Sequence, residues 1–366
     1  MGASVDIGLV LARSPYYIEI NEANQTATRI ELFIWVEGDT EPTIPTYSLS
    51  KKIPSSNQTN TIYNISPYLR EYFKFYGSSP NNGNIQNIKP EVDTYCYLRV
   101  KLYYTAGSET LLDEYTGIST DGYGYYTDGL NYSFTERILL TNLNYVNPVR
   151  NTPIAYTYPC DIDVEKIGTV TLFIDADNDY KIKYTEIGTG DFYEQTIDQA
   201  PLVNVQKTIY PTKGNIWQLY INDELYLTYV FQPQCECKYD VITVDFINRF
   251  GTWQREFFYK ASNETFEMSN NQYKLNPSKL DYNLYEGQDK TFNTNGRISI
   301  KANTGWVEEA YKAIIQELML SETVRVNEQP AMLKTKSVEK YNSINTKQIN
   351  YAMEFELAYD IINTVN

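Results

Sequence analysis

One group of four acidic residues has the spacing of a calcium-binding loop: Asp175, Asp177, Asp179 and Glu186. These residues match positions one, three, five and twelve of an EF-hand, where carboxylate oxygens surround one calcium ion. The sixth position needs glycine for a sharp turn, but it is Tyr180. The flanking segments alternate like strands rather than helices. We therefore interpret this stretch as a polar turn within a β-hairpin.

The cysteines offer a second possible metal site. Cys235 and Cys237 could supply two thiolates, but a closed zinc site needs four ligands, and no second pair lies at a useful spacing. With Cys96 and Cys160 included, the four cysteines are widely scattered in the sequence, which fits a reduced compartment rather than a disulfide scaffold. We expect neither a metal nor a cofactor.

The chain contains no histidine, which excludes Ser-His-Asp and Cys-His catalysis. A pair of carboxylates could still cleave glycosides. With 46 acidic residues, however, some pair will always be close, so a close pair of carboxylates does not by itself indicate catalysis. We expect that the protein is not an enzyme.

Residues 121–129 form a segment rich in glycine and tyrosine. The glycines allow the backbone to bend, and Tyr123, Tyr125 and Tyr126 offer rigid contact area at a low entropic cost. The sequence predicts a contact loop here. A disordered surface loop is the alternative.

The elements that should position these residues are clearest at residues 290–366. Apolar residues from Val307 to Leu318 recur at three- and four-residue steps, which predicts a helix, with Asn303 and Thr304 as its caps. Residues 349–360 alternate strictly, which predicts a long strand. Shorter strands are expected at 296–301, 323–326 and 331–340. The predicted interface residues in this region are Trp306, Tyr311, Met353 and Phe355.

The order of strand, helix and three strands predicts a C-terminal α+β module with one helix on an antiparallel sheet. Short alternating segments separated by turns precede it. They predict a mainly β chain with N-terminal β-sandwich units of immunoglobulin or fibronectin type. We expect a β-sandwich domain at 1–150, a second β-rich domain at 151–236 that could share its architecture, and an assembly domain at 237–366.

The overall composition limits the possible partners. The net charge is −15, so the chain should not bind DNA sequence-specifically or attach to an anionic membrane, although DNA could pass through an assembly of it. The sequence shows no signal peptide and no membrane-spanning segment. The 35 tyrosines suit half-buried sheet positions and interfaces.

Four stretches carry a resemblance to a known group of proteins: 9–15 together with 29–36, 65–70, 244–253 (Val-Asp-Phe-Ile-Asn-Arg-Phe-Gly-Thr-Trp), and 317–325 with the closing strands. With these, the chain resembles a tail-associated virion protein of the crAss-like bacteriophages. The resemblance implies a structural subunit of a ring or barrel in the phage tail. Such a subunit is assembled in the host cytoplasm, forms a homo-oligomer and contacts other tail or portal-proximal virion proteins.

Two other functions remain open. A host-binding tail fibre or adhesin would recognise a surface glycan through Tyr123–Tyr126 or the N-terminal sandwich, and fibres are usually trimers. A carbohydrate-active enzyme would reduce the viscosity of a polysaccharide, and we expect no such effect.

Overall fold

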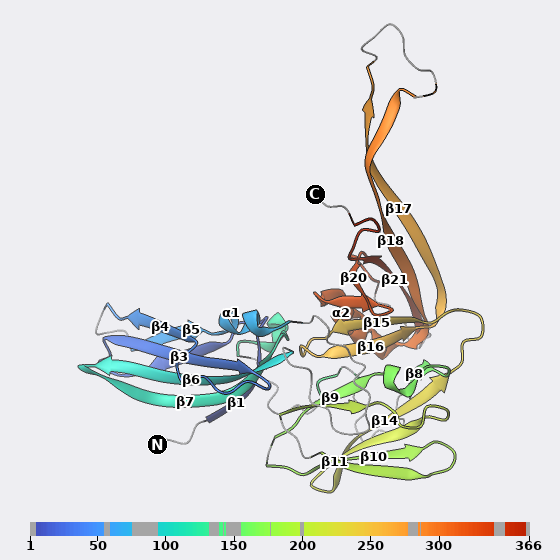
Figure 1. Cartoon of the computed structure of the whole chain (residues 1–366). Helices are drawn as coiled ribbons and strands as arrows, with labels where there is room; N and C mark the ends of the chain where they lie inside the picture. The colour runs from blue at the N-terminus through green and yellow to red at the C-terminus, as the bar shows by residue number, and fades with distance from the viewer. Residues whose placement is uncertain are drawn as a thin grey trace. The chain divides into compact units, whose positions relative to one another are not determined.

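The computed structural model describes residues 5–54, 59–74, 94–131, 139–141, 143, 155–175, 177–197, 201–276, 285, 287–339 and 348–363. In these residues the chain is mainly β, as predicted, and both α-helices are short (Figure 1). The chain forms two compact units. Unit 1 contains Met1–Cys235 and Phe246–Arg255, and unit 2 contains Glu236–Asp245 and Glu256–Asn366.

Unit 1 begins with seven strands in two sheets. The larger sheet has the order β1-β7-β6-β3-β4, and β2 pairs with β5 in the smaller one. Only the pairing of β1 with β7 is parallel among these described strands. The strand bounds are β1 (Val5–Leu11), β2 (Tyr17–Asn21), β3 (Ala27–Val36), β4 (Tyr47–Lys52), β5 (Asn60–Asn64), β6 (Tyr95–Ala106) and β7 (Ser108–Thr120). A short helix, α1 (Ser66–Leu69), and a 3-10 turn, η1 (Arg70–Tyr72), follow β5.

Alternation along the strands explains the core of this first half. Every second residue of β6 points inward, and its buried residues pack with those of β3, β2 and β5. The main members of this core are Ile18, Ile20, Ile30, Leu32, Ile34, Tyr63, Cys96, Leu98, Val100 and Leu102. Burial of one face of each sheet against the other stabilises the pair of sheets.

The second half of unit 1 repeats this strand order. The larger sheet has the order β8-β14-β13-β10-β11, and β9 pairs with β12. The first strand is again parallel to the last. Every strand therefore takes the position of its counterpart in the first half, which confirms that the two predicted segments share a strand arrangement. The bounds are β8 (Ala155–Pro159), β9 (Thr169–Phe173), β10 (Tyr180–Glu186), β11 (Phe192–Ile197), β12 (Leu202–Gln206), β13 (Asn215–Ile221) and β14 (Glu224–Gln234).

The remaining strands form a seven-stranded sheet of order β16-β15-β19-β20-β21-β18-β17. Most of this sheet belongs to unit 2, whereas the end of β15, the following turn and the start of β16 belong to unit 1. Strands β16 and β17 stand at opposite ends of this order, yet only Tyr259 separates them in sequence, so the sheet must curve back on itself. The rings of Phe258 and Phe355, 6.2 Å apart, lie inside this curve. The bounds are β15 (Ile242–Ile247), β16 (Trp253–Phe258), β17 (Lys260–Lys274), β18 (Asp289–Glu308), η4 (Glu309–Tyr311), α2 (Lys312–Leu320), β19 (Val324–Val326), β20 (Gln329–Leu333) and β21 (Gln348–Leu357).

The predicted C-terminal helix begins later than expected. Asn303, Thr304 and Val307 belong to β18, and α2 starts only at Lys312. Pairing of β18 with β21 includes Val307 opposite Ile349 and continues to Glu308, so the ladder overrides the local helical pattern. The predicted order of strand, helix and three strands is correct. The alternating strand is confirmed as β21, whose buried residues are Ile349, Tyr351, Met353, Phe355 and Leu357. The predicted strand at 331–340 is the shorter β20.

Two further expectations are wrong. Cys160 and Cys235 form a disulfide that ties the turn after β8 to the residue after β14, with the Cα atoms 5.1 Å apart. The parallel pairing of Pro159 with Gln234 brings these distant cysteines together. The predicted β-hairpin around residues 175–179 does not form, because the strands before and after this turn, β9 and β10, lie in different sheets. The three-domain division stays a prediction: its first two domains both fall in unit 1.

Candidate assembly surfaces

The predicted contact loop at 121–129 is an ordered turn that follows β7. Its centre is the 3-10 helix η2 (Tyr126–Asp128). The carboxylate of Asp128 accepts a hydrogen bond from the Tyr125 N–H at 2.7 Å, and the Asp128 N–H donates to the Tyr125 carbonyl at 2.9 Å. These reciprocal bonds fix the turn in the way a capping box fixes a helix start.

Two arginines hold the tyrosines of this loop. The Arg249 guanidinium lies 4.2 Å from the centre of the Tyr125 ring and forms an ion pair with Asp128. Arg13 lies 4.9 Å from the Tyr123 ring, which meets Tyr125 edge-on at 5.9 Å. Tyr123 is consequently buried, whereas the Tyr126 side chain is fully exposed. Of the three predicted tyrosines, Tyr126 alone offers its whole ring to a partner.

Arg249 belongs to the turn between β15 and β16, which packs against the end of β7 within unit 1. The Tyr123 N–H donates to the Arg249 carbonyl at 2.8 Å, and the Thr120 hydroxyl donates to the Phe250 carbonyl at 2.6 Å. Asn248 closes the turn by accepting from the Phe250 N–H at 2.9 Å and from the Thr252 N–H at 3.2 Å. One of the four stretches that carry the phage resemblance, 244–253, therefore has a structural role inside unit 1.

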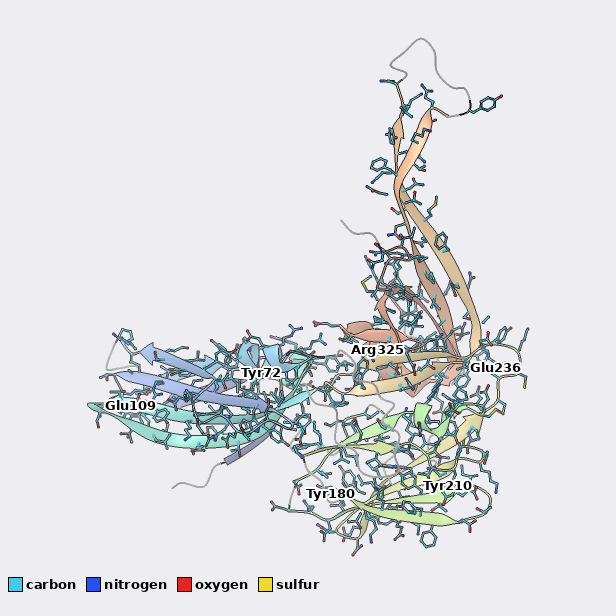
Figure 2. All side chains as sticks on the ribbon, in the orientation of Figure 1. Tyr72, Glu109, Tyr180, Tyr210, Glu236 and Arg325 are labelled. Carbon is cyan, nitrogen blue, oxygen red and sulfur yellow. A yellow bond between two sulfur atoms is a disulfide. The ribbon has the colours of Figure 1, made fainter. Side chains whose placement is uncertain are left out.

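A long two-stranded ribbon, formed by β17 and the first part of β18, is the second candidate surface. We call residues 260–276 and 287–298 the arm. It runs past β20 and β21 and out of the sheet of unit 2 (Figure 1). Its side chains project to both sides of the ribbon (Figure 2). Most residues of β17 are exposed, including the large apolar side chains of Phe266, Met268 and Tyr273.

One face of the arm continues the buried face of the sheet. Phe355 of β21 pairs with Ile300, which pairs with Glu264. Two residues further out on the same face, Ile298 pairs with Phe266. Phe355 is fully buried, but Phe266 and Met268 are 61% and 62% exposed. The apolar face of the core thus extends onto the arm, where nothing in the described chain covers it.

Gly296 allows the Phe266 ring to lie close to the ribbon. A Cβ atom on Gly296 would stand 2.4 Å from the ring, so any other residue would displace it. An aromatic ring placed over a glycine in the neighbouring strand supports the ladder at that position. The apolar face of the arm is therefore a formed structure rather than a set of loose side chains.

The opposite face of the arm base is held by ion pairs. Glu356 of β21 pairs with Lys334 and with Arg297, the latter at 3.0 Å, and Arg297 also reaches Asp360 at 2.7 Å. The hydrogen bond from Lys334 lowers the pKa of Glu356, and Arg297 lowers it further. At the start of β17, Lys260 pairs with Glu236 at 2.7 Å. These pairs fix the base from which the arm extends.

The four predicted interface residues of the C-terminal module have different environments. Trp306 on β18 is 66% exposed, and Tyr311 is half-buried with its hydroxyl donating to Glu256 at 2.9 Å. Met353 and Phe355 are fully buried in unit 2, where they support the sheet from inside. Trp306 is therefore the member of this set best placed to meet another chain.

The acidic residues of the predicted turn do not meet around one point. Asp175 accepts from the Asp177 N–H and from the Tyr180 hydroxyl, both at 3.0 Å. Burial is the main cause that raises the pKa of Tyr180 to about 12. Glu186 ends β10, about 20 Å along the strand from Tyr180. In the described residues no group of three or more potential ligands could hold a metal.

The sequence did not identify the arm. Residues 260–274 are mainly polar, and their alternation is weak because both faces are largely solvated. Two features of the sequence could have indicated the arm. Phe266 and Met268 stand two residues apart, as on one face of a strand, and the predicted strand at 296–301 could pair with them. The described residues include no helix with the length and apolarity needed to cross a membrane.

The chain matches no protein-family model and no curated protein.

Proposed function

We propose that this chain is a structural virion protein of a tailed bacteriophage, and that several copies form a ring or barrel in the tail around the DNA passage. The arm is the observation that carries this proposal. It has no core of its own, and it displays large apolar side chains that no other described part of the chain covers. An extended ribbon of this kind suits contact between subunits.

The strand order supports an immunoglobulin-like identity for both halves of unit 1. In such sandwiches, strands G, F, C and C′ form one sheet and B and E belong to the other. β7-β6-β3-β4 with β2-β5 follows this order, and so does β14-β13-β10-β11 with β9-β12. We propose two tandem immunoglobulin-like sandwiches followed by an α+β assembly module.

The charge of the chain fits a position around DNA. A net charge of −15 repels a polyanion, so DNA could move through the assembly without adhering to it. The proposed partners are further copies of this chain and other tail or portal-proximal virion proteins.

The test is the native mass of the purified protein, combined with imaging of any species larger than a monomer. We expect a closed ring of many copies. A variant in which residues 270–294 are replaced by Asn-Gly keeps the pairing of Ser269 with Asn295 and should form a smaller assembly. An unchanged number of copies would remove the deleted outer part of the arm from the interface.

A point variant refines this test. Phe266→Ser with Met268→Ser should weaken assembly, whereas Leu111→Ser with Leu112→Ser should not. The control removes two apolar side chains from β7 that are also exposed, at 48% and 36%. Equal effects of the two variants would contradict a specific contact through the arm.

The fully exposed Tyr126 on an ordered loop favours a second candidate, a tail fibre or adhesin that binds a surface glycan. Aromatic rings on rigid loops are effective contact residues. A trimeric assembly and glycan binding that is lost in Tyr126→Ser would support this candidate over the ring.

A further inference from the structure

The outer edge of β17 is open. β18 is the only described strand that pairs with β17, which stands at the end of its sheet. In such a strand, roughly every second residue directs its N–H and C=O groups away from the partner. An open edge of this length is a template for another strand unless proline, a bulge, charged side chains or a covering element blunts it.

In the part of the chain that the structure describes, no proline, bulge of β17 or covering element blunts residues 264–274, and the charged side chains of the segment are Glu264, Glu267 and Lys274. The segment contains no proline. The register shift near its middle places the extra residue on β18, because Ser269 to Asn271 spans two steps while Asn295 to Phe292 spans three. The other shift, between Lys260 and Asn263, lies at the base of the arm. The edge of β17 is thus regular over these residues.

We propose that this edge pairs antiparallel with the same edge of a second copy of the chain, around a two-fold axis at Ser269. The proposal rests on the assembly function proposed above, and it adds the partner and the geometry of the arm contact. The pairing joins the two ribbons into one sheet by main-chain hydrogen bonds, as in recognition by β-augmentation. A two-fold contact of this kind uses the same patch on both copies.

The charges of β17 favour the register in which Ser269 faces Ser269 of the second copy. With Ser269 on the axis, Lys274 lies opposite Glu264 of the second copy, and the symmetry makes this pair twice. Glu267 then faces Asn271, so no like charges meet. A register centred on Glu267 would instead place Glu267 opposite itself and Lys260 opposite Lys274. Opposite charges in directly facing positions stabilise a sheet, and like charges destabilise it.

The same register joins the apolar faces of the two arms. Phe266, Met268 and Glu264 share one face of β17, and a perpendicular two-fold axis keeps that face on the same side in both copies. Met268 then lies opposite Asn270 and diagonally from Met268 of the second copy. Diagonal neighbours are about 7–8 Å apart, within reach of long side chains. The exposed apolar side chains of both arms would form one continuous patch.

The overall charge also favours approach of two copies through the arm. Residues 260–308 contain six basic and six acidic residues, so the excess negative charge of the chain lies elsewhere. Two copies with a net charge of −15 each repel one another, and the repulsion is smallest where the contacting segments are neutral.

Cross-linking tests the register. In a Cys237→Ser background, which removes the exposed free thiol, Ser269→Cys should react with a short bis-maleimide to give a covalent dimer. Thr265→Cys is the matched control on the same face of the same strand. In the proposed register it faces Tyr273, and the two copies of residue 265 lie about 27 Å apart. Absence of the dimer with Ser269→Cys, or equal yields with both variants, would overturn the register.

A charge exchange tests the same pairing without cysteine. Lys274→Glu places two like-charge pairs in the contact and should weaken it about tenfold, since like charges in directly facing positions destabilise paired strands. Adding Glu264→Lys should restore the contact. No restoration would count against the pairing.

The outcomes separate this proposal from the assembly function. If the wild-type protein forms large assemblies but Ser269→Cys does not cross-link, the register is wrong and the assembly function remains. If the wild-type protein is monomeric at every concentration, both proposals fail.

Discussion

At the scale of single residues, the four cysteines have distinct chemical states. Cys160 and Cys235 are bonded to each other, Cys237 is exposed, and Cys96 is fully buried between the sheets of the first half of unit 1. Burial strongly raises the pKa of the Cys96 thiol, which keeps it protonated and unreactive. Thiol chemistry can therefore report on the fold directly.

We expect a thiol reagent to label one cysteine in the native, non-reduced protein and two after unfolding in urea. Reduction before unfolding should raise the count to four. Cys237→Ser should leave no fast-reacting thiol in the native state. Rapid labelling of two or more native cysteines would contradict the burial of Cys96 or the disulfide.

The ion pairs of Glu356 predict a pH dependence of stability. Because Lys334 and Arg297 lower the folded-state pKa of Glu356, its contribution is complete above its unfolded pKa of about 4.3 and is lost as the pH falls through the folded-state pKa. Glu356→Gln should therefore destabilise the protein at pH 7, and the difference from wild type should shrink at acidic pH. The measurement is the urea-unfolding midpoint at both pH values.

Glu354→Gln is the control for this change, on the same strand two residues earlier. Its midpoint should follow that of the wild type at each pH. A pH-independent effect of Glu356→Gln would assign its role to packing rather than to charge.

At the scale of elements, the turn between β15 and β16 depends on a glycine. Gly251 has φ +78°, and a Cβ atom there would lie 2.6 Å from the backbone nitrogens of Asp121 and Gly122. Neither backbone can move without breaking the contacts of Arg249 and Phe250. Packing of the turn against the end of β7 therefore requires the absence of a side chain at residue 251.

Gly251→Ala should destabilise unit 1 strongly, by more than about 3 kcal/mol, because backbone strain of about 1–3 kcal/mol adds to the clash. Gly107→Ala is the matched control: its φ is +90°, but a Cβ atom would have no neighbour within 4 Å. Gly107→Ala should therefore lose only the stability that the backbone strain costs. Equal losses of thermal stability would mean that the clash is relieved by movement of the turn.

The sequence predicted the elements whose signals are local. The strict alternation at residues 349–360 predicted β21 from adjacent residues alone. Between β13 and β14, positive φ angles at Asn222 and Asp223 make a tight turn. The arm, the disulfide and the true start of α2 depend on pairing between distant strands, which no local pattern reveals. The same limit applies to Tyr123, whose burial is due to distant Arg13 and Arg249.

At the scale of the whole molecule, two surfaces could join copies of the chain, and their symmetries differ. The proposed arm contact is two-fold and links copies in pairs. A ring needs a second, head-to-tail contact whose rotation closes. Trp306, which is 66% exposed on the C-terminal module, is the residue that we assign to this second contact. An assembly that uses both surfaces must contain an even number of copies, as two rings joined through their arms.

Because the two contacts differ in symmetry, removing each of them should leave a different assembly. Replacing residues 270–294 by Asn-Gly should convert the assembly into single rings of half the mass, because only the two-fold contact is removed. Trp306→Ser should instead leave arm-paired dimers, since the loss of one large apolar anchor at the centre of a contact often costs 2 kcal/mol or more. Native mass measurement separates these species. If the shortened arm yields monomers, the arm itself closes the ring, and the two-fold pairing cannot be its only contact.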